Sequence, residues 1–273
     1  MREHQIELRL CPRRGPLQRL EELAIETAPS TPLREHVDCF GNLVHRLSLI
    51  APHRELRVRL RARVETRLEN PFDFAALAPE AERAWLMQRL REEPRLHEFR
   101  LHRSDAVPEL GRAAGEPEAP APDPRLGLLE NVQALMEWSA AHFAYQQGAT
   151  DVHAPLSVFF EKRAGVCQDF AHWLIAAVRG WGFPARYASG YVDLGDGEET
   201  AEQAAMHAWA EVLVPGAGWR GVDATHRLVA NDRYVVTAVG RDSRDAAPVR
   251  GAFKGDHGGE APRVRLRVAR DAQ

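Results

Sequence analysis

Residues 163–173 read RAGVCQDFAHW, and the cysteine in this stretch decides how the rest of the chain is interpreted. Cys167 follows a glycine-containing turn and stands at the head of CQDFAHWLIAAVRGWG (167–182), a run with helical periodicity. The apolar residues of one predicted face are Phe170, Ala171, Leu174, Val178 and Trp181. Cys167 heads this apolar stripe, so the sequence predicts a buried helix with the cysteine at its N-terminus.

A cysteine in that position has two interpretations. The positive end of the helix dipole and the free N–H groups of the first turn favour a thiolate and can stabilise an oxyanion. Free cysteines are also common as small buried residues, and the helix alone does not separate the two. Asp169 and His172 stand two and five positions further on and are expected to project away from Cys167, so a catalytic partner must come from elsewhere.

A partner is predicted on a hairpin further along the chain. MHAWAEVLVPGAGWRGVDATHR (206–227) has two strand-like arms around a PGAG turn. If Leu213 pairs with Trp219, then His207 becomes a diagonal neighbour of Asp223 on one face. An imidazole to take the thiol proton and a carboxylate to orient it are what a thiol nucleophile requires. A one-residue change of register would move Asp223 to the other face, leaving a core histidine and a turn-flanking aspartate.

The bulk composition excludes several classes of protein. The chain has 273 residues, 27% of them charged, and a net charge of −3, which gives no general attraction to nucleic acid or membrane. It contains no apolar run long enough to span a membrane, and its N-terminus lacks the apolar core of a signal peptide. The three widely spaced cysteines form neither a disulfide framework nor a metal knuckle. We therefore expect a cytoplasmic enzyme or binding protein.

Residues 1–69 are predicted to form an antiparallel β domain. Apolar and polar residues alternate within HQIELRLC (4–11) and ELRVRLRARVETRL (55–68). Between them, LEELAIETAPSTP and HVDCFGNLVHRLSLI indicate further strands interrupted by proline and Gly-Asn turns.

From Asn70 the period changes. PEAERAWLMQRLREE (79–93) predicts an amphipathic helix, and the prolines of AAGEPEAPAPDP predict an exposed segment without regular structure. We assign residues 70–124 to a helical and proline-rich connecting region and residues 125–273 to a catalytic core. An acidic stretch at 193–202 is either a solvated surface or a gate for a cationic substrate.

These features resemble the bacterial transglutaminase-like proteins of the transglutaminase/papain-like superfamily. The blocks that carry the resemblance are GVCQDFAH (165–172), GFPARYASGY (182–191), HAWAEVLVPGAGWRGVDATHR (207–227) and NDRYVVTAVGRDSRDAAPVRG (231–251). The resemblance implies an α+β fold, with an N-terminal antiparallel β-sandwich-like domain and a papain-like core. In that core the nucleophile stands at a helix N-terminus packed on an antiparallel sheet.

The family pattern implies a nucleophile at Cys167, a general base at His207 and an orienting acid at Asp223, in agreement with the hairpin geometry. Two departures stand out: relatives usually begin with one more strand, and Tyr234 stands where they often have a histidine. We assign no role to Tyr234 from the sequence.

The expected function is cysteine-dependent acyl transfer or hydrolysis at amide bonds of peptides or proteins, through a thioester intermediate. Water as acceptor would make the enzyme a peptidase or amidase, and an amine would make it a transglutaminase. The alternative is a non-catalytic module of the same fold that binds a protein or peptide partner, although the intact Cys/His/Asp set speaks against it. A zinc site built from Cys167, His172 and His207 is a weaker option, because His172 faces the wrong way and no further cysteine is near. The sequence has no calcium-loop pattern of regularly spaced acidic residues, so we expect no metal requirement and no cofactor.

Overall fold

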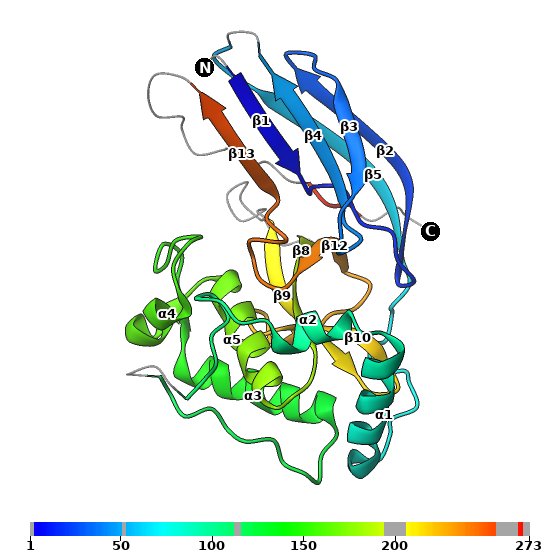
Figure 1. Cartoon of the computed structure of the whole chain (residues 1–273), viewed down its shortest axis with the longest axis vertical. Coiled ribbons are helices and arrows are strands. Elements are labelled where there is room, and N and C mark those ends of the chain that lie inside the picture. Colours follow the sequence, from blue (N-terminus) through cyan, green and yellow to red (C-terminus); the bar gives the residue numbers. More distant parts are fainter. Residues whose placement is uncertain (1–2, 51–52, 112–115, 194–205, 255–266, 270–273) are drawn as a thin grey trace.

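The computed structural model of the chain describes residues 3–50, 53–111, 116–193, 206–254 and 267–269. The N-terminal strands form a β-structure at one end of the molecule, and helices and a second sheet form the other end (Figure 1). The fold class expected from the sequence, α+β with antiparallel sheets, is confirmed. The acidic 193–202 stretch lies almost entirely outside the described residues.

Two β layers make up the N-terminal part. Its strands are β1 (Glu3–Leu8), β2 (Gln18–Ala28), β3 (Leu33–Val37), β4 (Leu43–Leu49) and β5 (Arg57–Thr66). Strands β1, β4 and β3 belong to one sheet, whereas β2 and β5 pair as a separate ribbon. Ile6, Leu8 and Leu47 form a small core against which Val58 of the ribbon packs. The two layers are therefore joined through apolar side chains.

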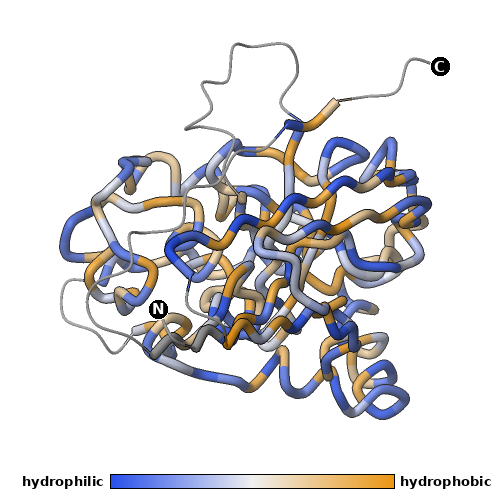
Figure 2. Tube along the Cα trace, turned by 90° about the horizontal axis from the view of Figure 1, so that it is seen from above, coloured by the Kyte–Doolittle hydropathy of each residue, from blue (hydrophilic) through white to orange (hydrophobic). Residues whose placement is uncertain are grey.

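Alternation of side chains determines which face of these strands is covered. Along β5 half-buried residues alternate with exposed ones, so that Leu60 faces inward while Arg59 and Arg61 face solvent. The same alternation between hydrophilic and hydrophobic residues is visible along the extended segments in Figure 2. The arginines of this strand thus lie on the solvated side of the ribbon.

The last described strand, β13 (Val249–Lys254), pairs antiparallel with β1 at the edge of the N-terminal sheet. The chain therefore returns to its starting sheet after it has passed through the mixed helix and sheet part (Figure 1). This pairing joins residues more than two hundred positions apart, as in Ile6 with Gly251.

The helices belong to the second part of the molecule. They are α1 (Pro79–Glu92), α2 (Leu96–Leu101), α3 (Leu128–His142), α4 (Leu156–Lys162) and α5 (Cys167–Gly180). Helix α1 has proline in its first turn, acidic residues near its start and arginines near its end, which suits the helix dipole. None of the described helices is both long enough and apolar enough to cross a membrane.

A five-stranded antiparallel sheet supports helix α5. Its strands are β8 (Ala185–Val192), β9 (His207–Val214), β10 (Gly218–Asp223), β11 (Leu228–Val229) and β12 (Tyr234–Gly240), in the order β11-β10-β9-β8-β12. Helix α5 packs on β8 and β9, and its Leu174 and Val178 are fully buried together with Val212 of the sheet. This packing holds the first turn of α5 near the start of β9.

Helix α5 ends as its sequence predicts. Gly182 has a positive φ of 89°, and its N–H donates to the carbonyl of Arg179 while the N–H of Phe183 donates to that of Val178. These two bonds form a Schellman motif, which satisfies carbonyls left without helical partners. The helix therefore stops just before the strand β8 that pairs with β9.

Candidate active site

Cys167 is the first residue of α5 and is half-buried. The two residues before the cap form β7 (Ala164–Gly165), which pairs parallel with β6 (Ala144–Tyr145). Asp169 accepts hydrogen bonds from the N–H of Val166 and from the hydroxyl of Thr150. Asp169 therefore fixes the entry into the helix, and the cysteine stands where the first-turn N–H groups are free of helical partners.

Close packing in this turn explains the glycine before the cysteine. A Cβ on Gly165 would lie 2.5 Å from the Asp169 carboxylate and 2.6 Å from the ring of Phe159. No side chain larger than hydrogen fits without moving one of these groups. The stretch RAGVC thus combines a tight approach with a helix start.

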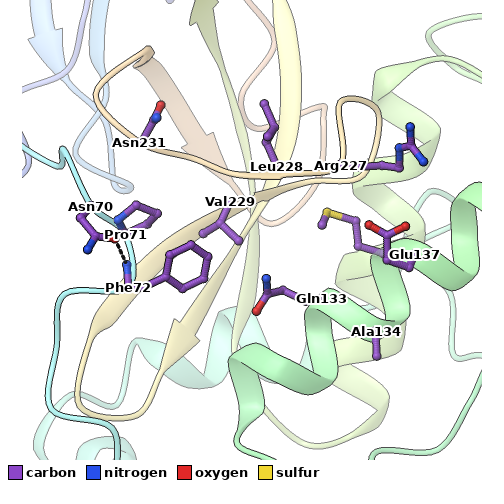
Figure 3. Close-up of a pocket in the computed structure, with 11 residues that line it drawn as sticks. Asn70, Pro71, Phe72, Gln133, Ala134, Glu137, Arg227, Leu228, Val229 and Asn231 are labelled. Carbon is purple, nitrogen blue, oxygen red and sulfur yellow. Dashed lines mark hydrogen bonds between the residues drawn. The ribbon is translucent and has the colours of Figure 1, made fainter.

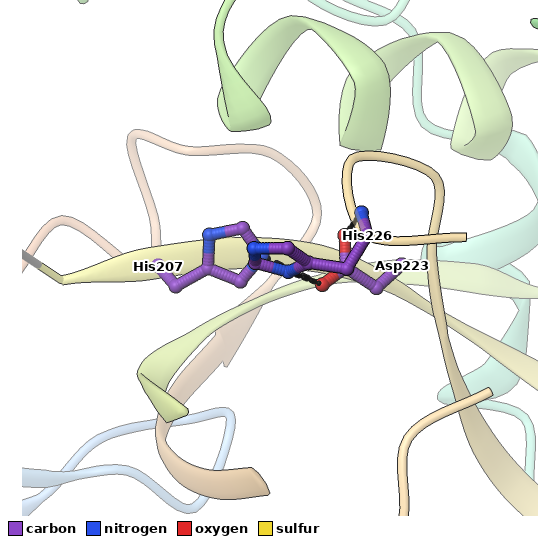
Figure 4. Close-up of side chains that lie close together, drawn as sticks. All are labelled: His207, Asp223 and His226. Carbon is purple, nitrogen blue, oxygen red and sulfur yellow. Dashed lines mark hydrogen bonds and ion pairs between the residues drawn. The ribbon is translucent and has the colours of Figure 1, made fainter. Parts of the chain in front are cut away.

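The hairpin of β9 and β10 has the register predicted from the sequence. Leu213 pairs with Trp219 and Ala210 pairs with Val222, so the first residue of β9 and the last of β10 meet at the same end of the sheet. Nε2 of His207 lies 2.7 Å from Oδ2 of Asp223 (Figure 4). Because a carboxylate only accepts hydrogen bonds, the imidazole donates through Nε2, which leaves Nδ1 directed elsewhere.

The hydrogen bonds and charges around His207 and Asp223 shift the pKa of both residues. Burial by itself would lower the pKa of His207, but hydrogen bonds to Asp223 and Cys167 and the negative charge of both outweigh it and raise the pKa to about 10. Burial would raise the pKa of Asp223, yet hydrogen bonds from His207 and His226 hold it well below its usual range. The electrostatics therefore favour an imidazolium at His207 beside an ionised carboxylate at Asp223.

The pair is held in a largely enclosed setting. The side chain of Asp223 is 1% exposed and that of His207 is 13% exposed. Trp209 lies beside the His207 ring, with centroids 6.1 Å apart, and the ring of Tyr234 meets Trp209 edge-on at 5.2 Å. These aromatic contacts limit the orientations available to His207 and keep water from the carboxylate.

Two residues that the sequence did not assign reach the same carboxylate. Nδ1 of His226 lies 2.7 Å from Oδ2 of Asp223, and the Tyr234 hydroxyl donates to that oxygen at 2.9 Å. The only sequence signal for His226 was its position three residues after Asp223 in DATHR. Tyr234 is a departure from the family pattern, and its contact with Asp223 depends on the order of the strands in the sheet.

Asp169 and His172 lie apart from this cluster, as expected. Asp169 is engaged at the helix start, and His172 is enclosed among Tyr187 and other core residues. Nε2 of His172 accepts a hydrogen bond from the N–H of Ser243, and burial lowers the pKa of His172 to about 3. His172 is therefore a neutral core residue and does not join Cys167 and His207 around a metal ion.

His207, Asp223 and His226 form a different group of potential metal ligands, with ligand atoms within 4.8 Å of one another. Two nitrogen or oxygen ligands on a tetrahedral zinc ion are separated by about 3.3 Å. Both imidazoles lie closer to Oδ2 than that, at 2.7 Å, which is the length of a charge-assisted hydrogen bond. His207, Asp223 and His226 therefore form a hydrogen-bonded network in this structure.

Tyr145 lies near Cys167. It pairs with Gly165 in the short ladder of β6 and β7, and the residue is 49% exposed. Burial raises the pKa of the Tyr145 hydroxyl, and the negative charge of Cys167 adds to that effect. The Tyr145 side chain is thus exposed close enough to Cys167 to feel its charge.

A separate pocket of about 480 Å³ opens between helix α3, the 70–72 segment and the loop after β10 (Figure 3). Phe72, Glu137 and Arg227 are among the residues that line it, and Cys167 and His207 are not. Arg227 follows His226 in the chain, so the pocket adjoins the loop of the cluster without containing its reactive groups.

Family models match most of the chain. The Transglutaminase-like superfamily matches residues 118–224, a range that contains Cys167, His207 and Asp223. The Bacterial transglutaminase-like N-terminal region matches residues 1–65.

Individual proteins are similar over nearly the whole length. An uncharacterized protein of Mycobacterium leprae is 32% identical over 255 residues, which cover 91% of this chain and 86% of that protein. An uncharacterized protein of Mycobacterium tuberculosis is 33% identical over 256 residues, covering 89% and 79%. The crystal structure of a candidate cysteine protease from Cytophaga hutchinsonii matches with a TM-score of 0.71 at 23% identity, covering 93% of this chain and 82% of that one. The last comparison concerns the fold alone.

Proposed function

Because this chain belongs to the bacterial transglutaminase-like proteins, we propose that it is a cysteine-dependent enzyme that acts on amide bonds of peptides or proteins through a thioester intermediate. In this proposal Cys167 is the nucleophile, His207 the general acid and base, and Asp223 the group that orients His207. Known members of the superfamily are enzymes, which favours this function over that of a passive binding module.

The first half-reaction forms the acyl-enzyme. The Cys167 thiolate attacks the substrate carbonyl carbon, and the backbone N–H of Cys167 helps to stabilise the oxyanion at the helix N-terminus. The His207 imidazolium gives its proton to the amide nitrogen as the C–N bond breaks. The products are a Cys167 thioester and a free amine.

The second half-reaction releases the acyl group. Neutral His207 takes a proton from water or from an amine, which attacks the thioester carbonyl. The C–S bond breaks, and Cys167 leaves as a thiolate beside the imidazolium. Water yields a carboxylic acid and an amine yields a new amide, so the acceptor decides between hydrolysis and transamidation.

One observation carries the assignment more than any other. His207 hydrogen-bonds Asp223, and its pKa is raised to about 10 by Asp223 and Cys167 despite the opposing effect of burial. A histidine that served only as a packing residue would resemble His172, whose pKa is lowered by burial to about 3. The difference between the pKa values of His172 and His207 supports a catalytic role for the His207 imidazole.

The experiment is a screen of peptides with and without amine acceptors, in which wild type and Cys167→Ala are compared. The expected result is product formation in wild type, a covalent thioester mass in stopped samples, and neither in the variant. Product formation that persists in Cys167→Ala would refute the proposal. Specific retention of a peptide by both proteins, with no turnover in either, would identify the non-catalytic binding module instead.

A further inference from the structure

Asp223 accepts more hydrogen bonds than its proposed partnership with His207 requires. Oδ2 accepts from His207, from Nδ1 of His226 and from the Tyr234 hydroxyl. Oδ1 accepts from the backbone N–H groups of Thr225 and His226, at 3.0 and 3.3 Å. His226 alone supplies two of these donors, one from its ring and one from its backbone (Figure 4).

The local backbone explains how the ring reaches the carboxylate. Asp223 is the last residue of β10, and the chain turns immediately after it. Arg227 has a left-handed conformation, with φ of 56°, and closes that turn before β11 begins. The turn places the His226 ring 4.6 Å from the His207 ring, centroid to centroid, on the same side of Asp223.

We propose that His226 is a positioning residue for the proposed catalytic pair: its Nδ1–H bond to Oδ2 fixes the Asp223 carboxylate in the rotamer that orients His207. This inference rests on the proposed function of Cys167, His207 and Asp223. His226 touches neither the thiol nor the reacting carbonyl in this proposal and acts only through Asp223.

The physical argument concerns the freedom of a carboxylate. The backbone N–H groups of Thr225 and His226 hold Oδ1, so the ring of His226 acts on the other oxygen, Oδ2, which it shares with His207 and Tyr234. Loss of that ring removes one of three side-chain donors to the oxygen that His207 contacts, and small rotations of the carboxylate about χ2 then change the geometry of the His207 hydrogen bond. The side chain of Asp223 is almost fully buried, whereas that of His226 is 28% exposed. The partly exposed ring of His226 is therefore the outermost of the three side chains that bond Oδ2, and its loss can be tested without removing the His207 contact itself.

Asparagine is the informative replacement, because its side-chain Nδ2–H₂ occupies nearly the place of Nδ1–H of histidine. His226→Asn can keep the hydrogen bond to Asp223, whereas His226→Leu has similar bulk and no donor. His36→Leu, on the exposed face of strand β3, is a matched control for histidine loss away from the cluster.

The experiment uses two readouts that need no substrate. The first is the rate of Cys167 alkylation by iodoacetamide as a function of pH, since the reactive thiolate depends on His207. The second is the NMR signal of the hydrogen-bonded His207 imidazole N–H, assigned by its loss in His207→Gln. Thermal unfolding of each variant shows whether the fold is retained.

We expect His226→Leu to slow Cys167 alkylation about tenfold at neutral pH, the effect of losing one hydrogen bond to a charged group, and to broaden or shift the His207 signal. His226→Asn should restore both, and His36→Leu should change neither. An unchanged His207 signal and alkylation rate in a folded His226→Leu protein would overturn the proposal, as would equal impairment in His226→Asn and His226→Leu.

The proposed function can fail separately. If Cys167→Ala retained turnover, Cys167 would not be the nucleophile, yet the His207 signal would still report whether His226 positions Asp223. Loss of the His207 signal in His226→Leu together with retained turnover in Cys167→Ala would therefore refute the proposed function and leave the positioning role intact.

Discussion

Nε2 of His207 lies 2.7 Å from Oδ2 of Asp223, although the two residues stand on different strands and sixteen positions apart. The hairpin register brings them together. Leu213 and Trp219 pair beside the turn, and antiparallel pairing then continues without a register shift to Ala210 and Val222. Local pairing near a tight turn thus fixes a contact at the far end of the hairpin.

Asp223→Asn should leave the fold intact and lower turnover far more than substrate binding. The amide cannot supply the charge that stabilises the imidazolium, and it can select the other tautomer of His207. In the serine-protease analogue this change costs on the order of 10⁴ in turnover. Steady-state kinetics on a substrate from the peptide screen would measure it, with Asp123→Asn as a control, because Asp123 is a partly exposed aspartate in an ion pair with Arg125. Unchanged turnover in Asp223→Asn would show that Asp223 does not orient the base.

The raised pKa of His207 predicts a specific dependence of stability on pH. The folded protein holds the His207 proton up to about pH 10, whereas an unfolded histidine releases it near 6.5. Below about 6.5 both states are protonated and the stabilisation is complete. Above it the folded state binds more protons, so this contribution to the free energy of unfolding declines as pH rises through the window.

Urea unfolding of wild type and His207→Gln across that window would isolate the contribution. We expect the stability advantage of wild type over the variant to shrink steadily as the pH is raised. A difference that stays constant with pH would mean that His207 has an ordinary pKa in the folded protein.

Gly165→Ala should destabilise the protein by roughly 1–3 kcal/mol, the usual cost of overpacking. The added methyl group would overlap the Asp169 carboxylate and the Phe159 ring, and so would disturb the turn before Cys167. Gly180→Ala is the matched control, because a Cβ on Gly180 meets nothing within 4 Å and alanine is favoured in a helix. Equal stability of the two variants in urea unfolding would contradict this account of the turn.

The parts of the site that could be predicted from the sequence depend on local signals. Helical periodicity with Gly182 and Pro184 predicted where α5 begins and ends, within a few residues. The PGAG turn predicted the register that joins His207 to Asp223. In each case the determining residues lie within one helix or one hairpin.

The contacts that could not be predicted from the sequence depend on the order of the strands in the sheet, or on side chains that hydrogen-bond the backbone of a turn. Tyr234 reaches Asp223 from β12, which is separated from β10 by two strands of the sheet. The sequence predicts a strand at Cys39, but Cys39 lies in an exposed turn. Asp38 causes that turn, because its carboxylate accepts the N–H groups of Phe40 and Asn42.

Chelation should leave the reactive thiol unchanged. Both imidazoles hydrogen-bond Asp223 at 2.7 Å, a separation that suits proton sharing better than joint coordination of a metal ion. Treatment with 1,10-phenanthroline should therefore alter neither the Cys167 alkylation rate nor the turnover found in the peptide screen. Elemental analysis of the purified protein, with loss of activity on chelation and recovery on adding zinc, would reverse this conclusion.

The final prediction is that the three thiols differ in reactivity. Cys167 should be alkylated by iodoacetamide fastest at near-neutral pH, because its position at a helix N-terminus and the nearby imidazolium both favour the thiolate. Cys39 is an exposed thiol in a turn and should react at an ordinary rate. Cys11 should be slowest, because burial raises its pKa to about 12 and the residue is only 1% exposed.

The comparison with His207→Ala tests the cause of that order. Arg13 and Arg14 follow Cys11 in sequence, but Sγ of Cys11 faces Nδ1 of His45 at 3.4 Å inside the N-terminal part. Cys11 is thus buried, and we expect its alkylation to stay slow despite the nearby arginines. Cys39 is exposed, so its alkylation rate is the reference for an accessible thiol without activation. His207→Ala should slow Cys167 toward the rate of Cys39 and leave the other two unchanged, as read by mass spectrometry of a limited reaction. If Cys167 reacts no faster than Cys39 in folded wild type, although a small uncharged thiol reagent reaches it, Cys167 is a packing residue and not a nucleophile.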